Sequence, residues 1–157
     1  PLYLTAAQGM DRPLANILIG LSRISGLFTT LMAGWATDRF GPKRTLFLVL
    51  LLTGLATLLM GFTSGAWLIL FVFVQPMLAP CFFPAGFAAL SRLGSAEGRS
   101  LGVSVAVPLG FLFAGGALPV GIGLLGDAGH FAAGIAGAGA LILSGSFLPR
   151  LLKLRET

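Results

Sequence analysis

Residues 34–44 read Gly-Trp-Ala-Thr-Asp-Arg-Phe-Gly-Pro-Lys-Arg and lie between two long apolar segments. Four charged side chains fall within seven residues of this stretch: Asp38, Arg39, Lys43 and Arg44. Charges this dense are costly in hydrocarbon, so the segment must stay in water. The stretch therefore predicts a short turn between two membrane-crossing helices.

The composition is that of a membrane protein. Hydrophobic residues make up 56% of the 157 residues, charged residues 10%, and the mean hydropathy is +0.97, whereas a soluble domain carries about a quarter charged residues. From Thr45 to Ser91 there is no Asp, Glu, Lys, Arg or His. As one helix this run would extend roughly 70 Å, more than twice a ~30 Å bilayer core. The chain must therefore turn back within this run. The glycines and hydroxyl residues at 61–65 predict that the turn lies there.

These patterns predict an all-α fold, a single membrane domain over residues 1–157 built as a polytopic transmembrane helical bundle. A partial helix at residues 1–7 is too short to cross a bilayer. Because the chain opens on Pro rather than Met, we interpret it as the outer end of a helix whose beginning is missing. Five complete membrane-crossing helices are expected at 14–36, 45–62, 66–90, 100–125 and 129–149.

The basic residues lie almost wholly on one side of this scheme. Arg12 is alone on the other side and Arg23 lies within a helix, whereas eight share one side: Arg39, Lys43, Arg44, Arg92, Arg99, Arg150, Lys153 and Arg155. Positively charged loops are retained in the cytoplasm, so we expect that side to be cytoplasmic. Topology explains the net charge of +5, and no nucleic-acid partner is expected. We expect a multi-pass integral protein of the bacterial inner membrane.

The charged turn resembles the signature loop between the second and third helices in each half of Major Facilitator Superfamily transporters. Gly34, Asp38, Arg39 and Gly41 match the pattern, while Pro42 stands where a basic residue is usual. Helix spacing, loop lengths and sidedness extend the resemblance over nearly the whole chain. It implies one six-helix half with a truncated first helix. The short basic tail 151–157 favours the carboxy-terminal half, although a chain cut inside the linker between halves would look the same.

The resemblance also implies a conformational gating loop. In the family, the acid equivalent to Asp38 lies near the amino end of a helix from the other half, where the dipole and free amides favour negative charge. That contact helps to close the cytoplasmic side. The alternative is a plain positively charged turn. The expected gating residues are Gly34, Asp38, Arg39, Gly41, Lys43 and Arg44.

Arg23 is the one charged residue deep inside a predicted span, about 13 Å from its outer end. An arginine there costs at least ~2.5 to 3.5 kcal/mol, so it should face water, a partner or a ligand. Asn16, Gly20 and Thr30 lie near the same side of the helix. A guanidinium favours an anionic substrate group, which it can bind bidentately. A structural pair with a carboxylate or carbonyl of the missing half is an equally weighted alternative.

The span 66–90 carries Gln75-Pro76, Pro80 and Pro84. Prolines kink a helix and free carbonyls that a cavity or a neighbouring side chain must satisfy. Gln75 is its one strong hydrogen-bonding side chain, although a helix-to-helix hydrogen bond is the commoner role of a buried glutamine. The predicted substrate-binding residues are thus Arg23, Gln75 and Asn16.

The last two spans indicate bending and packing more than chemistry. Glycines and prolines should bend 100–125, which lacks the order typical of proton antiporters, and the Gly/Ala run 132–140 predicts close helix contact. His130, near Asp127, could serve a proton-linked step, but an exposed loop histidine is the commoner case. Cys81 has no partner for a disulfide within the chain.

We therefore predict a secondary active transporter that moves a small solute, with an organic anion favoured by Arg23, by alternating access. Its partners would be that solute, a coupling proton or ion, the lipid bilayer and the missing half. We predict no enzyme activity, no cofactor and no metal site. The alternative is a non-transporting membrane sensor or assembly subunit on the same scaffold. An intramembrane enzyme would need paired ionisable residues within the spans.

Overall fold

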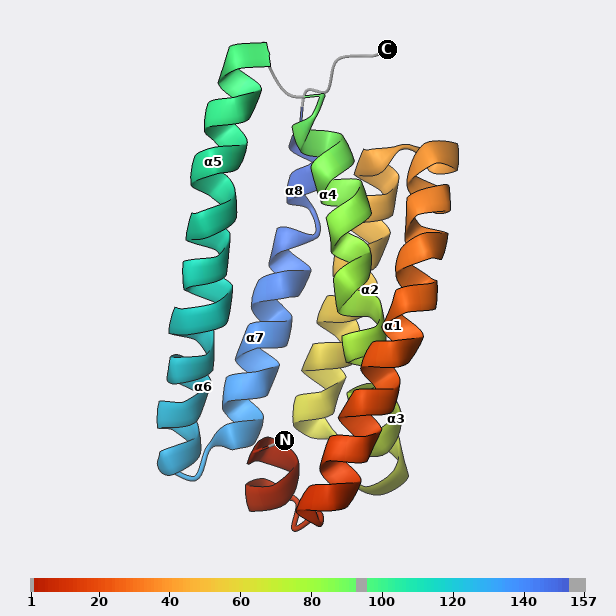
Figure 1. Ribbon diagram of the computed structural model, residues 1–157. Helices are drawn as coiled ribbons and strands as arrows, with labels where there is room; N and C mark the ends of the chain where they lie inside the picture. Colours follow the sequence, from red (N-terminus) through yellow and green to blue (C-terminus); the bar gives the residue numbers. More distant parts are fainter. Residues whose placement is uncertain (1, 93–95, 153–157) are drawn as a thin grey trace.

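The computed structural model describes residues 2–92 and 96–152, apart from the side chains of residues 96–99 and 101. The described residues form a bundle of helices without strands (Figure 1), which confirms the predicted all-α class. The side chain of Arg99, and all of Lys153 and Arg155, lie outside the described residues.

Within the described residues, five helical segments are long and apolar enough to cross a membrane. A π-helical turn, η1 (Tyr3–Ala7), precedes them. The first two segments are single helices, α1 (Arg12–Phe40) and α2 (Pro42–Phe62). The other three segments are interrupted. The third consists of α3 (Gly65–Leu78), the 3₁₀ turn η2 (Ala79–Cys81) and α4 (Phe82–Leu90), and the fourth of α5 (Ala96–Leu112), η3 (Phe113–Ala117) and α6 (Leu118–Asp127). The fifth consists of α7 (Phe131–Gly145) and α8 (Leu148–Leu151).

The charged stretch is helical on both sides of a one-residue turn, rather than an open loop. Asp38 and Arg39 belong to the last turn of α1, which runs beyond the expected 14–36, and α2 begins at Pro42. At 29 residues, α1 is roughly 43 Å long, so its end can leave a ~30 Å hydrocarbon core without unwinding. Gly41 between them has φ +85°, a conformation that favours glycine.

The tightest packing joins α2 to α7, where small residues let the two backbones touch. A Cβ added at Gly61 would lie 2.8 Å from the carbonyl oxygen of Ala132, and one at Gly139 would overlap the backbone of Leu58. The Gly/Ala run 132–140 therefore packs as the sequence predicts, with backbone against backbone.

A second contact joins α1 to the proline-rich third segment. Thr29 Oγ1 donates a hydrogen bond of 2.6 Å to the carbonyl oxygen of Met77. One turn earlier, a Cβ added at Gly26 would meet the carbonyl oxygen of Pro76 at 3.4 Å. The 3₁₀ turn η2 follows directly, so α1 braces the segment where its prolines interrupt the helix.

The α5–η3–α6 segment lies at the flank of the bundle (Figure 1). None of its residues from Gly102 to Asp127 is buried. The π-helical turn η3, which contains Gly115 and Gly116, interrupts the α-helix in the middle of the segment.

The turns alternate between the two ends of the bundle (Figure 1). One end carries the α1–α2 turn, the end of α4, the start of α5, and α8, while η1 and the α2–α3 and α6–α7 turns lie at the other end. The described basic residues of the first end are Arg39, Lys43, Arg44, Arg92 and Arg150. Arg12 begins α1 at the opposite end. That the basic end is cytoplasmic stays a prediction.

Candidate substrate site and gating turn

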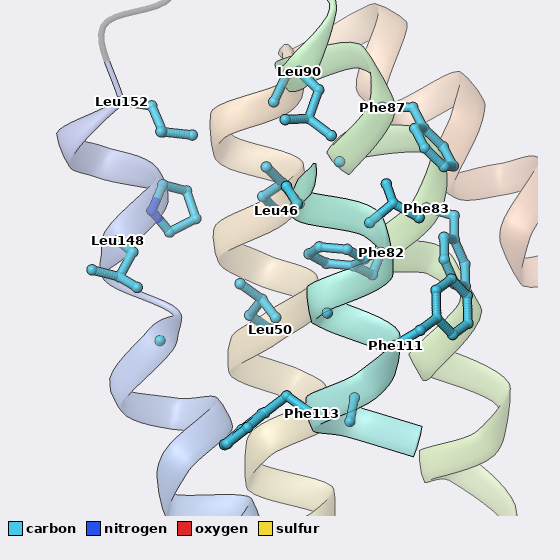
Figure 2. A pocket seen from close by; sticks show the side chains of 18 residues that line it. Leu46, Leu50, Phe82, Phe83, Phe87, Leu90, Phe111, Phe113, Leu148 and Leu152 are labelled. Atoms are coloured by element: carbon cyan, nitrogen blue, oxygen red, sulfur yellow. The ribbon is translucent and has the colours of Figure 1, made fainter. Parts of the chain in front are cut away.

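One cavity of the bundle has a purely apolar lining. It encloses about 670 Å³ between α2, α4, α5–η3 and α7–α8, and Figure 2 shows its leucine and phenylalanine side chains. None of its lining residues carries a charged or hydrogen-bonding side chain. Such a surface has no group that could orient a polar solute, so it is not the candidate substrate site.

The second cavity, of about 600 Å³, brings together two of the three predicted substrate-binding residues. Arg23 from α1 and Gln75 from α3 both line it. Tyr3 of η1, Met60 of α2 and Ile135 of α7 contribute further walls. The remaining lining residues are Leu4, Ile19, Val72, Pro76, Ala79 and Pro80.

Among the described residues, Arg23 supplies the only charge that lines this cavity. It lies eleven residues after the start of α1, or about 16 Å along the axis, which is close to the middle of a ~30 Å bilayer core. Its side chain is exposed to the cavity and the open face of α1. No hydrogen bond or ion pair joins it to another residue in the described part of the chain. Its donors are therefore available to a ligand or a partner segment.

Gln75 is half-buried and directly precedes Pro76. Its backbone carbonyl accepts a hydrogen bond from the N–H of Ala79, which closes the last turn of α3. Pro80 has no backbone N–H, so the carbonyl of Pro76 lacks the donor that an α-helix would place four residues ahead. The cavity wall thus contains the amide side chain of Gln75 next to a backbone carbonyl that lacks its helical donor. The other lining residues of this segment have aliphatic side chains.

Tyr3 also lines the cavity, although it is not among the site residues that the sequence predicts. Its hydroxyl donates to the carbonyl oxygen of Met60 at 3.2 Å and accepts from Gln8 Nε2 at 3.1 Å. Its ring lies 6.3 Å from that of Phe131. It is the only tyrosine of the chain, but it lies outside the complete predicted helices, so no periodicity indicated which way it faces.

Asn16 does not line the cavity with Arg23. It is exposed near the start of α1, two helical turns before Arg23, and its role as a substrate contact stays a prediction. Thr30, at the other end of the same stripe, donates to the carbonyl of Gly26 in its own helix at 2.7 Å. The stripe from Asn16 to Thr30 is about 21 Å long, and only its middle meets the cavity.

The predicted gating residues lie together at the α1–α2 turn. The N–H of Gly41 donates to the carbonyl of Thr37 at 3.0 Å, and the Thr45 hydroxyl donates to the carbonyl of Gly41 at 3.1 Å. Asp38 and Arg39 are exposed, and Asp38 has no hydrogen-bond or ion-pair partner among the described residues. Apart from the nearby backbone of α1 itself, no described atom lies within 4 Å of a Cβ built at Gly34, so no neighbouring helix packs closely there.

The other chemical groups are isolated. The described residues contain no group of three or more His, Cys, Asp or Glu side chains that could hold a metal ion. Cys81 is buried at 3% exposure, with its thiol facing the carbonyl of Met77 at 3.8 Å. His130 and Asp127 are both exposed at the α6–α7 turn.

Comparison with known proteins gives this architecture its class. The sequence profile of the Major Facilitator Superfamily matches residues 1–157, so the chain belongs to the Major Facilitator Superfamily. Over 103 residues it is 29% identical to the "Uncharacterized MFS-type transporter YqjV" of Bacillus subtilis (strain 168). That match covers 64% of this chain and 25% of the relative, so the chain spans only part of the relative's length. No solved structure matches the chain.

Proposed function

We propose that the complete protein is a secondary transporter that moves a small organic anion across the membrane by alternating access. Membership of the superfamily supports transport in general. The position of Arg23 supports an anionic substrate, because Arg23 lines a cavity near the middle of the membrane without a partner among the described residues.

The chemistry of the cavity favours an anion with an apolar body. A guanidinium near the bilayer centre costs at least ~2.5 to 3.5 kcal/mol, and a carboxylate or phosphate group bound bidentately would offset that cost. Gln75 adds an amide that can donate to or accept from a polar substituent, whereas Ile19, Val72 and Pro76 offer only apolar surface. One cation among apolar walls suits a monoanionic amphipathic solute better than a multiply charged one.

The α1–α2 turn supports the conformational part of the proposal. Asp38 is exposed and unpaired among the described residues at the end of α1, so it is free to contact a helix amino end of the other half in one state. Breaking and forming that contact would bias the equilibrium between the two orientations of the halves. The basic end of the bundle faces the cytoplasm in this scheme, and a proton or ion drives the cycle.

A binding assay on the purified full-length protein tests whether the substrate is an anion. Small aliphatic and aromatic carboxylates are compared with their neutral amides by calorimetric titration. We expect carboxylates to bind and the amides to bind at least about tenfold more weakly, because the charge-assisted pair is lost.

Variants of Arg23 locate the site. Arg23→Lys keeps the charge but loses the planar fork and should weaken carboxylate binding, while Arg23→Ala should nearly abolish it. Arg12→Ala removes the basic residue at the start of the same helix, α1, and serves as the matched control. Unchanged carboxylate affinity in a folded Arg23→Ala protein would contradict the proposal.

A further inference from the structure

Arg150 is held over aromatic rings at the basic end of the bundle, far from the cavity of Arg23. Its guanidinium carbon lies 4.1 Å from the centroid of the Phe47 ring and 5.5 Å from that of Phe147. The two rings are 5.9 Å apart. Stacking of this kind orients an arginine at an exposed site and is worth about 0.5–1 kcal/mol.

The ring contacts leave the guanidinium of Arg150 without a polar partner among the described residues. Arg150 is exposed, and no hydrogen bond or ion pair engages its side chain within the described residues. Its N–H groups can therefore form the bidentate pair that a phosphate accepts.

Lys43 is a second cation on the helix that carries Phe47. It lies one helical turn before Phe47 on the same face of α2, and it is half-buried without an ion-pair partner among the described residues. Phe47 thus contacts the Arg150 guanidinium and lies one helical turn from Lys43 on α2.

Apolar side chains surround the same place. Phe147 is 54% exposed, Leu148 62% and Leu151 77%. Since α2 and α8 belong to segments that can cross a membrane, these side chains lie where acyl chains meet headgroups. A ligand that joins a negative headgroup to hydrocarbon tails complements both parts of this surface, whereas a soluble anion would use only the cations.

We propose that Arg150, stacked on Phe47 and Phe147, forms with Lys43 a binding site for the phosphate of an anionic phospholipid. Anionic lipids are attracted to basic clusters at the cytoplasmic surface of membrane proteins, and here the rings fix one cation of the cluster in place. The site is independent of the substrate cavity and does not rest on the transport proposal.

Native mass spectrometry of the purified full-length protein tests this site with two probes of equal chain length, dioleoylphosphatidylglycerol and dioleoylphosphatidylcholine. We expect tighter binding of phosphatidylglycerol, and Arg150→Gln should lower its affinity about tenfold, as for loss of a charge-assisted bidentate pair. Phe47→Leu, which keeps every charge, should lower it about threefold. Phosphatidylcholine binding should not change.

Arg12→Gln is the matched control, because it removes one charge from the opposite end of the bundle. If Arg150→Gln does not yield folded protein, Arg150→Lys carries the test, with an intermediate loss expected because the planar fork is gone. Equal phosphatidylglycerol affinity in wild type and the folded Arg150 variant would overturn the proposal. So would an equal loss in Arg12→Gln, since net charge alone would then explain the binding.

Discussion

Thr29 on α1 donates a 2.6 Å hydrogen bond to the backbone carbonyl of Met77, one residue after Pro76. The bond links the helix that carries Arg23 to the segment that carries Gln75. Met77 lies between Pro76 and Pro80, which remove backbone donors from this segment, and the Thr29 hydroxyl adds a bond to it from the neighbouring helix. The relative position of the two candidate substrate contacts thus depends on a third side chain.

Thr29→Val keeps the shape of the side chain but removes the donor. We expect it to destabilise the full-length protein by about 0.5–1.5 kcal/mol and to expose the nearby Cys81 thiol more often. Thermal unfolding and the rate of Cys81 alkylation are the measurements. Thr30→Val is the matched control, since Thr30 donates only to Gly26 of its own helix. Equal effects of the two variants would contradict the bridging role of Thr29.

The contact between α2 and α7 can be tested with two alanines. Gly139→Ala places a Cβ against the backbone of Leu58, so the helices must separate, at a cost of about 1–3 kcal/mol. Gly137→Ala, two residues earlier on the same helix, places its Cβ where nothing lies within 4 Å and should be neutral or slightly stabilising. Unfolding temperatures of the two variants decide the matter. Similar temperatures would show that the backbones are not in contact.

We predict that loss of the negative charge in the charged turn slows transport without impairing membrane insertion. Asp38→Asn keeps the shape and loses the charge, and with it about 0.3–2 kcal/mol of interaction with a helix amino end. We expect slower transport with normal membrane insertion, because the contact forms in one state only. Asp127→Asn at the opposite end is the control. Normal transport by Asp38→Asn would make this segment a positively charged turn and no more.

Sidedness is testable by cysteine labelling in whole cells, with Cys81 replaced. A reagent that cannot cross the membrane should label Ala128→Cys in the α6–α7 turn and leave Lys43→Cys unlabelled, because the basic end is retained in the cytoplasm. Both positions lie at turns at opposite ends of the bundle. Labelling of Lys43→Cys from outside would invert the topology.

The sequence predicts the helical class well, because hydropathy and charge act over whole helices. It also indicates Arg23 and Gln75 as candidates, because a polar group is costly in an apolar helix, and both residues line one cavity. It does not predict that Tyr3 and Met60 complete their cavity, because those contacts depend on how η1, α1, α2 and α3 pack. Asn16 lies on the expected side of α1, but two turns too far along to line the cavity. Periodicity gives the direction of a side chain and not the depth at which a cavity begins and ends.

The charged turn shows a similar limit. Its position follows from charge and from Gly41-Pro42, yet the sequence suggested a loop where the structure continues α1 through Asp38 and Arg39. Charged side chains do not end a helix that extends past the hydrocarbon core, whereas a glycine at φ +85° followed by proline does. The helix boundary is therefore set by backbone geometry and not by polarity.

Solute flux into proteoliposomes containing the full-length protein tests the central claim most directly. Radiolabelled carboxylates that bind the purified protein are compared with their neutral amides, with protein-free liposomes as the blank. We expect uptake of at least one carboxylate above the blank, little uptake of its amide, and loss of carboxylate uptake in Arg23→Ala. If carboxylates bind but none enters above the blank, the protein is a sensor or an assembly subunit and not a transporter. Equal uptake of carboxylate and amide, or undiminished uptake by Arg23→Ala, would contradict the assignment of Arg23 as the anion-binding residue.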